Sequence, residues 1–283
     1  MKIILAKTAG FCYGVERAVR IAIELAQSAA APVRSLGPIV HNPQVVGDLS
    51  RKGVKVVVSA ARLRKGTVIV SAHGRTAAEI AGLKRRGVAV VDATCPNVLR
   101  AERLAAELAR EGRVVVLLGD PNHPEVRAVA SYAKGAPVII AAGPWDLPVL
   151  KGVQMVGVVA QTTQKKARFD ALVGVLRARV DNLRVFDTIC SATKKRQEEA
   201  EKLSRGVDVM IVVGGRDSAN TMRLAEICRK NCPRTFQIES AADLRALRFK
   251  KNDTVGVTAG ASTPESVIKE VVERLKVSGT QRE

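Results

Sequence analysis

The sequence predicts an α/β fold built on parallel sheets, and three observations predict it. Six times along the 283 residues, a short run rich in Val and Ile ends in a small or polar turn and leads into a helical pattern. Aromatic residues make up only 3% of the chain, so the core must consist mainly of Val, Leu, Ile and Ala, which suits strands buried between helices. Polar residues gather at the turns after the strands, where α/β folds bind ligands.

Each repeat joins an expected strand to the helix that follows it. The expected pairs are 2–11 with 12–26, 67–74 with 75–87, 114–123 with 124–135, 154–162 with 163–179, 207–215 with 216–230, and 254–262 with 263–276. They fall into rough thirds, so we expect three small lobes with mostly parallel sheets: 13–95, 96–189, and 190–275 together with 1–12. The strand before Cys12 is expected to pair with the last lobe, which otherwise contains few strands.

The composition indicates a globular protein of the cytoplasm. Hydrophobic residues make up 47% and charged residues 26%. The opening MKIILAKTAG is expected to form a strand, because its apolar run is too short for a secretory signal and no cleavage site follows it. The other apolar runs are too short to span a bilayer, so no membrane association is expected.

The net charge of +19 implies acidic partners. The basic residues are scattered over expected helix faces, for example at 84–86, 165–168 and 194–196, and they form no basic tail. The chain carries no RNA-recognition signature and no Cys/His finger spacing. Solvated basic helix faces are therefore favoured over a nucleic-acid site, and docking of an acidic electron donor also fits.

Three of the five cysteines share one kind of position. Cys12, Cys95 and Cys190 each follow a strand-like run and precede a helix, about one per third of the chain. A helix N-terminus favours the thiolate that ligates metals. Three such ligands suit an iron–sulfur cluster with one open iron, or a zinc site completed by histidine, although spacing alone does not exclude inert thiols. Cys228 and Cys232, four residues apart, are expected to be core or surface thiols.

All three histidines also lie at turns between a strand and a helix. They are His41 in IVHNP, His73 in SAHGR and His123 in DPNHPEV, and anion binding beside helix N-termini is the simplest shared role. Glu125 lies in the first turn of its helix, where it either complements the helix dipole or acts as a proton donor.

Hydroxyl and amide side chains occupy three further turns. Thr162 lies in AQTTQ, Ser218 and Asn220 in GGRDSAN, and Ser262 in AGAST. Such groups are common helix caps, and they also hold phosphate oxygens. Because one cap per helix suffices, the surplus polar groups indicate a ligand.

The motifs GFCYGV, VHNP, SAHG, DATCP, NHPEV, AQTT, ICSAT–RQ and TAGAS occur in this order over residues 1–275. Together they resemble the LytB-type reductases, a family of iron–sulfur enzymes that act on 4-hydroxy-3-methylbut-2-enyl diphosphate. The resemblance implies a trefoil of three lobes around a central 4Fe–4S cluster, with an open apical iron and three ligands, Cys12, Cys95 and Cys190. It also implies an electron donor, acidic and of the ferredoxin or flavodoxin type.

The resemblance further implies the roles of the polar residues. Glu125 would deliver protons to the departing hydroxyl, with Thr162 and His123 nearby. The diphosphate would be held by His41, His73, His123, Thr162, Ser218, Asn220 and Ser262. The reaction would be a reductive dehydroxylation to isopentenyl and dimethylallyl diphosphate, the last step of the non-mevalonate pathway. One departure is Ala219, where many relatives have a second serine, so one hydroxyl donor to the diphosphate is missing.

Three other classes of function compete with this interpretation. An iron–sulfur hydro-lyase would use the same three ligands without net reduction. A basic nucleic-acid-binding or redox-sensing protein would explain the charge. A zinc hydrolase would use the thiolates and histidines for a different metal.

Overall fold

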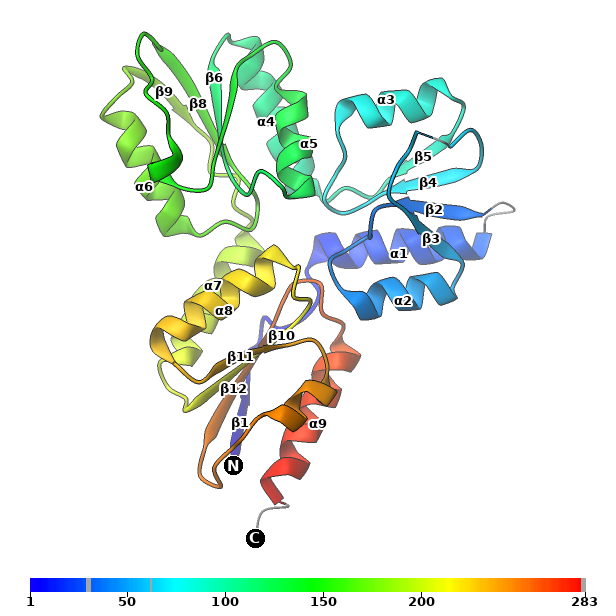
Figure 1. Cartoon of the computed structure of the whole chain (residues 1–283), viewed down its shortest axis with the longest axis vertical. Helices are drawn as coiled ribbons and strands as arrows, with labels where there is room; N and C mark the ends of the chain where they lie inside the picture. The colour runs from blue at the N-terminus through cyan, green and yellow to red at the C-terminus, as the bar shows by residue number, and fades with distance from the viewer. Residues whose placement is uncertain (29–31, 62, 281–283) are drawn as a thin grey trace. The chain divides into compact units, whose positions relative to one another are not determined.

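The computed structural model describes residues 1–28, 32–61 and 63–280. It contains three four-stranded sheets in which every pair of neighbouring strands is parallel, and most strands lead into an α-helix (Figure 1). The predicted α/β class with three parallel sheets is therefore confirmed. The chain divides into two compact units, one of Met1–Val15, His41–Gly47 and Ser191–Glu283, the other of Glu16–Val40 and Asp48–Cys190. The three lobe boundaries stay a prediction.

The first unit contains one sheet, which joins the two ends of the chain. Its strands, in spatial order, are β1 (Lys2–Leu5), β12 (Thr254–Ala259), β10 (Val209–Val213) and β11 (Thr235–Ile238). Lys2 is in register with Thr254 and Leu5 with Val257. The predicted pairing of the first strand with the last third of the chain is thus confirmed.

Strand β10 shows why the apolar runs are continuous. All five of its residues are buried. Val209, Ile211 and Val213 pack into a cluster with α9 (Glu265–Thr280), while Met210 and Val212 pack into a cluster with α7 (Ser191–Ser204) and α8 (Ala219–Asn231). Because successive side chains point to opposite faces, a strand covered on both faces needs apolar residues at every position.

The second unit contains two sheets. The first has the order β3 (Val54–Val57), β2 (Val33–Leu36), β4 (Thr67–Val70) and β5 (Ala89–Asp92). The other has the order β7 (Val138–Ala141), β6 (Val114–Leu118), β8 (Met155–Ala160) and β9 (Asn182–Val185).

The described residues form further helices. The α-helices are α1 (Tyr13–Ser28), α2 (Pro43–Arg51), α3 (Ala77–Arg85), α4 (Pro96–Arg110), α5 (Pro124–Tyr132) and α6 (Lys166–Arg177), and the short 3-10 turns are η1 (Pro144–Asp146) and η2 (Ala241–Ala246).

The helix starts follow from their sequences. Thr76 caps α3 in a reciprocal capping box with Glu79. Proline occupies the first position of both α4 and α5, where its missing N–H costs nothing. These starts fix the direction of the turns that carry the predicted site residues.

The three sheets repeat one topology. In each sheet we call β2, β6 or β10 the first strand. The second strand (β3, β7 or β11) lies at the edge beside it, and the third strand (β4, β8 or β12) lies on its other side. The fourth strand (β5, β9 or, in the first unit, β1) lies at the opposite edge. All six predicted strand–helix pairs are present. Three further strands, β2, β5 and β9, correspond to the strands expected before His41, Cys95 and Cys190. The strands β3, β7 and β11 have no predicted counterpart.

Candidate active site

Every predicted site residue follows the carboxyl end of a strand, and the fourth strand of each sheet leads to a cysteine. The first strands β2, β6 and β10 lead to His41, to His123 with Glu125, and to Ser218 with Asn220. The third strands β4, β8 and β12 lead to His73, Thr162 and Ser262, and the fourth strands β1, β5 and β9 lead to Cys12, Cys95 and Cys190. Since parallel strands place their carboxyl ends along one edge, each sheet presents one thiol beside polar ligand groups.

Cys95 and Cys190 lie close together in the second unit. The Cys95 N–H donates to the carbonyl of Ala72 at 3.0 Å, and the Cys190 N–H donates to the carbonyl of Thr162 at 2.9 Å, so neighbouring strands fix both turns. The side-chain nitrogen of Asn97 lies 3.3 Å from the Cys190 sulfur and 4.0 Å from the Cys95 sulfur. Both thiols are partly exposed. Two partly exposed thiols beside one donor nitrogen fit a pair of soft metal ligands.

The turn that carries Cys12 lies in the first unit and is held by α7. The guanidinium of Arg196 donates to the carbonyls of Thr8 and Gly10 at 2.9 and 2.7 Å. The carboxylate of Glu199 accepts hydrogen bonds from the N–H groups of Lys7 and Thr8 and from the Thr8 hydroxyl. The prediction of a solvated basic face at 194–196 is wrong for Arg196, which is 4% exposed, because the carbonyls of the turn replace water around its guanidinium.

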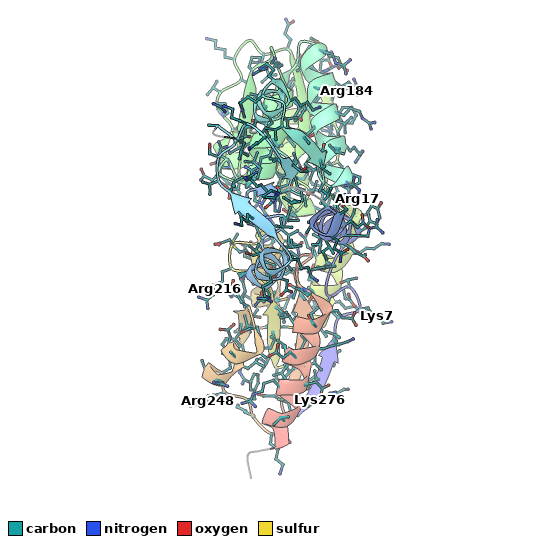
Figure 2. The ribbon with its side chains drawn as sticks, turned by 90° about the vertical axis from the view of Figure 1, so that its right-hand side faces the viewer. Lys7, Arg17, Arg184, Arg216, Arg248 and Lys276 are labelled. Carbon is teal, nitrogen blue, oxygen red and sulfur yellow. The ribbon has the colours of Figure 1, made fainter. Side chains whose placement is uncertain are left out.

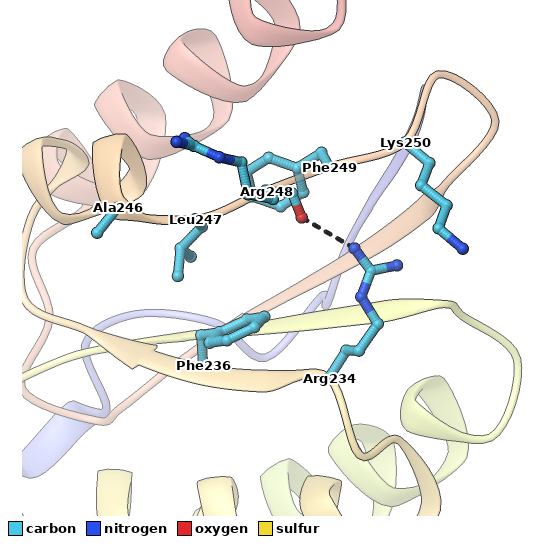
Figure 3. A pocket seen from close by; sticks show the side chains of 7 residues that line it. All are labelled: Arg234, Phe236, Ala246, Leu247, Arg248, Phe249 and Lys250. Carbon is cyan, nitrogen blue, oxygen red and sulfur yellow. Dashed lines mark hydrogen bonds between the residues drawn. The ribbon is translucent and has the colours of Figure 1, made fainter.

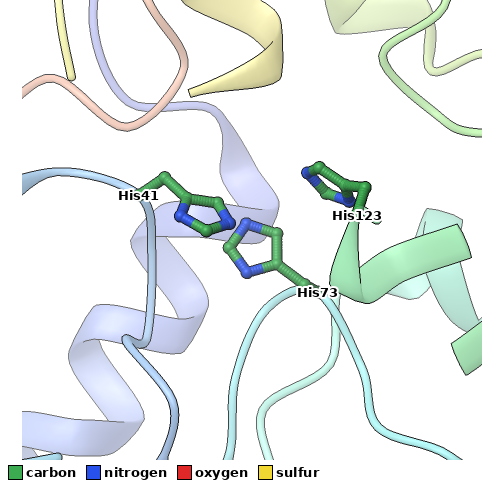
Figure 4. A group of neighbouring side chains, drawn as sticks. All are labelled: His41, His73 and His123. Atoms are coloured by element: carbon green, nitrogen blue, oxygen red, sulfur yellow. The ribbon is translucent and has the colours of Figure 1, made fainter. Parts of the chain in front are cut away.

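His73 and His123 form an edge-to-face pair in the second unit. Their ring centroids are 5.5 Å apart and their planes are inclined by 86° (Figure 4). The Nδ1 atom of the buried His123 accepts the backbone N–H of Glu125 at 3.1 Å, so this side chain caps α5. In the neutral ring the hydrogen therefore resides on Nε2, which is a donor of the kind that binds phosphate oxygens.

Glu125 and Thr162 are in direct contact and are both buried. The Thr162 N–H donates to one carboxylate oxygen of Glu125 at 2.5 Å, and the Thr162 hydroxyl is hydrogen-bonded to the other at 3.0 Å. The predicted neighbourhood of these two residues is present. A buried carboxyl group with a hydroxyl neighbour is a chemically competent proton donor.

The hydroxyl and amide groups of the first unit differ in what they contact. Ser218 caps α8 and accepts the N–H of Thr221 at 3.4 Å. The Ser262 hydroxyl donates to the carbonyl of His41 at 3.1 Å. Asn220 is 5% exposed, yet neither polar atom of its side chain has a hydrogen-bond partner among the described residues. A buried amide without a partner is costly in a purely structural role, so Asn220 has the properties of a ligand-binding group.

Sequence reasoning missed a buried glutamate beside this site. Burial, with added repulsion from Asp92 and Glu125, raises the pKa of Glu102 to about 8. One Glu102 oxygen packs against Gly74, where a Cβ atom would approach it to 2.6 Å, in the turn that carries His73. The sequence offers no signal for this position, because Glu102 occupies an interior turn of α4 among ordinary helix-forming residues.

Cys228 and Cys232 belong to the hydrophobic core of the first unit. Burial, followed by the neighbouring Cys232, raises the pKa of the Cys228 thiol to about 12. The two sulfur atoms lie near the carbonyls of Ala200 and Asp208. The sequence predicted that these two cysteines are either core or surface thiols, and the structure shows that they lie in the core.

The basic side chains project from many elements. Figure 2 labels examples on or beside β1, α1, β9, α8, η2 and α9: Lys7, Arg17, Arg184, Arg216, Arg248 and Lys276. The expectation of scattered basic groups agrees with this distribution. Within the described ranges, no helix is long and apolar enough to cross a membrane.

A separate groove of about 420 Å³ lies beside the edge strand β11. Phe236, Leu247 and Phe249 line it, together with basic residues (Figure 3). Arg234 donates to the carbonyl of Arg248 and forms an ion pair with Asp253 at 2.9 Å. None of the predicted site residues lines this groove.

The fold and the site together define an α/β protein with one thiol, and polar ligand groups, at the end of each of three parallel sheets. The family model described as LytB protein matches residues 3–276, and the chain belongs to this family.

Known relatives support the same conclusion. The 4-hydroxy-3-methylbut-2-enyl diphosphate reductase of Geobacter sulfurreducens is 47% identical over 276 residues, which are 98% of this chain and 97% of the relative. That of Geobacter metallireducens is 46% identical over the same shares of both chains.

Solved structures agree with the fold. A structure of (E)-4-hydroxy-3-methyl-but-2-enyl diphosphate reductase, described as the terminal enzyme of the non-mevalonate pathway, is 39% identical with a TM-score of 0.72, over 98% of this chain and all of that chain. The Plasmodium falciparum E-1-hydroxy-2-methyl-but-2-enyl-4-diphosphate reductase is 27% identical with a TM-score of 0.89, over 97% of this chain and 88% of that one.

Proposed function

We propose that this chain catalyses the reductive dehydroxylation of 4-hydroxy-3-methylbut-2-enyl diphosphate. Two electrons and two protons convert the allylic alcohol into isopentenyl or dimethylallyl diphosphate, and the hydroxyl leaves as water. The observation that carries the proposal is the placement of Cys95 and Cys190 around one nitrogen, in a chain that belongs to the LytB family.

Three thiolates of the chain are assigned to one 4Fe–4S cluster. The ligands are Cys12, Cys95 and Cys190, which follow equivalent strands of the three sheets. When bound, such a cluster supplies the electrons and an open Lewis-acidic iron for the allylic hydroxyl. The buried Cys228 and Cys232 are excluded from this role by their place in the hydrophobic core.

The diphosphate is assigned to the polar groups at the strand ends. His41, His73 and His123 supply ring nitrogens, and Ser218, Asn220, Ser262 and Thr162 supply hydroxyl or amide groups. The buried Asn220, which lacks a hydrogen-bond partner among the described residues, supports this assignment, since a diphosphate oxygen would accept a hydrogen bond from its Nδ2 atom.

Proton delivery is assigned to Glu125. A hydroxide ion is a poor leaving group, and an acid that protonates it in the transition state lowers the barrier. The contact with Thr162 holds the Glu125 carboxyl group in one orientation. The Nδ1 atom of His123 accepts the backbone N–H of Glu125, which leaves its Nε2 atom available for the substrate.

The electron donor is proposed to be an acidic ferredoxin or flavodoxin of the cytoplasm. The net charge of +19 favours encounter with acidic proteins. The rate of reduction by such a donor is then expected to fall steeply as salt screens the charges. A rate that does not depend on salt would contradict this assignment.

The decisive experiment is anaerobic. The protein is purified, its cluster is rebuilt, and oxidation of a reduced viologen dye is followed after the substrate is added. Substrate-dependent oxidation is expected, and Cys95→Ser should abolish it together with iron retention. The matched variant Cys232→Ala should keep its iron. No oxidation by a fully loaded protein would remove the reductase, and dehydration without a reductant would indicate a hydro-lyase.

A further inference from the structure

Asn97 occupies the first turn of α4, two residues after the cap residue Cys95. Its side-chain nitrogen lies 3.3 Å from the Cys190 sulfur and 4.0 Å from the Cys95 sulfur, in hydrogen-bonding geometry to both. One amide group therefore faces two thiols that follow different strands, β5 and β9. Neither the family description nor the names of the relatives assigns a role to this residue.

The hydrogen bond from the Asn97 amide to a sulfur atom is weak when the sulfur is a neutral thiol and stronger when the sulfur carries negative charge. A thiol is a poor acceptor, whereas a hydrogen bond to an ionised acceptor is roughly twice as strong as a neutral one. A carboxamide has two N–H groups, so one nitrogen can donate to both sulfur atoms at once. The position of Asn97 is therefore useful to the protein when Cys95 and Cys190 carry negative charge.

We propose that Asn97 raises the reduction potential of the cluster that Cys95 and Cys190 help to hold, an inference that rests on the proposed function. Hydrogen bonds to ligating sulfur atoms are one of the factors that set the potential of iron–sulfur clusters. Reduction adds one negative charge to the cluster, and that charge is shared with the ligating sulfur atoms. An N–H dipole aimed at these atoms stabilises the reduced form more than the oxidised form.

Asn97 is thus a tuning residue that acts through the two cysteines. Its amide makes the cluster easier to reduce by a given donor. It contacts both sulfur atoms from the first turn of α4.

The test is a redox titration of loaded protein, followed by absorbance and by electron paramagnetic resonance. Asn97→Leu removes both N–H donors at similar size, and Asn97→Asp replaces the amide with a negative charge of the same shape. Asn231→Leu is the control, because the Asn231 amide donates to the Ser204 hydroxyl and not to a thiol. Iron and sulfide contents are measured first, so that only loaded protein is compared.

We expect a more negative potential in Asn97→Leu, a further negative shift in Asn97→Asp, and an unchanged potential in Asn231→Leu. A loaded Asn97→Leu protein with the parental potential would overturn the inference and leave the proposed function standing. If Asn97→Leu does not load a cluster, Asn97→Asp is titrated in the same way. A parental potential in the loaded aspartate variant would also overturn the inference. A parent protein that never loads a cluster contradicts the proposed function itself.

Discussion

Both carboxylate oxygens of Glu125 are hydrogen-bonded to Thr162, one to its backbone N–H at 2.5 Å and one to its hydroxyl at 3.0 Å. The two residues follow strands β6 and β8 of the same sheet, which are direct neighbours. The acid is therefore positioned by the sheet itself, and its side chain has little freedom to rotate. Removing either the Glu125 carboxyl group or the Thr162 hydroxyl should therefore lower the turnover rate.

Replacing Thr162 by valine should lower kcat by about tenfold, because the carboxyl group of Glu125 loses the hydroxyl that orients it. Thr162→Ser keeps the hydroxyl and should retain most of the activity. Viologen oxidation at saturating substrate measures both variants, and thermal unfolding shows whether they are equally folded. Parental turnover in a folded valine variant would exclude a part for this hydroxyl in proton delivery.

Replacing Asn220 by leucine should have opposite effects on stability and on substrate binding. The buried amide has no partner among the described residues, so a leucine of similar size is expected to raise the free energy of unfolding by about 1 kcal/mol. The Michaelis constant for the diphosphate should rise at least tenfold. Denaturant unfolding and steady-state kinetics measure the two effects.

The matched control for Asn220 is Asn231→Leu near the other end of α8, where the amide already has the Ser204 hydroxyl as a partner. This control should leave the Michaelis constant unchanged. An Asn220→Leu protein that is less stable than the parent would show that the amide has a structural role instead.

The stability of the protein should fall as the pH rises from about 5 to about 8 because of Glu102. Burial, then Asp92 and Glu125, raises the pKa of this carboxyl in the folded state to about 8, above its ordinary value of 4.5. The folded state thus binds the Glu102 proton more tightly than the unfolded state, and the stabilisation is complete below pH 4.5 and is lost as the pH passes through 8.

Glu102→Gln removes this titration. The variant should be more stable than the parent by on the order of 2 kcal/mol at pH 8, and its free energy of unfolding should depend less on pH. Urea unfolding at several pH values measures the effect, with the exposed Glu198→Gln as a control for the loss of one negative charge. Equal pH slopes in parent and variant would contradict the raised pKa.

Replacing Arg196 by methionine should destabilise the first unit by about 2 kcal/mol. The buried guanidinium donates to the carbonyls of Thr8 and Gly10, and methionine leaves both carbonyls without this donor. Because these carbonyls belong to the turn before Cys12, iron retention after reconstitution should fall as well. The exposed neighbour Lys195→Met is the matched control, and an equal loss in both variants would speak against the specific contact.

The sequence allowed most of the fold to be predicted because the central strands are buried on both faces. A strand such as Val209–Val213 is apolar at every position, and this pattern stands out from the helices around it. The second strands β3, β7 and β11 had no predicted counterpart. Each is followed by a loop or a 3-10 turn instead of an α-helix, so it lacks the strand-then-helix pattern that marks β1, an edge strand of the same length.

The sequence predicted some residues of the candidate site and missed others. Cysteines and histidines are rare in this chain, so their repeated appearance at strand ends is informative. Asn97 and Arg196 are ordinary polar residues of a helix, and only the contacts of their side chains distinguish them. Asn97 lies two residues after Cys95, but residues two apart in a helix do not face each other, so this spacing alone does not predict the contact.

The pairing of β1 with β12 has a consequence for how the protein is made. Residues 2–5 are synthesised well before the strand that pairs with them among the described residues, β12, which comprises residues 254–259. The two sheets of the second unit are complete in sequence once residue 185 has been synthesised. The turn with Cys12 must therefore wait until β12 has been made, and co-translational folding would complete the surroundings of this thiol after the two sheets of the second unit.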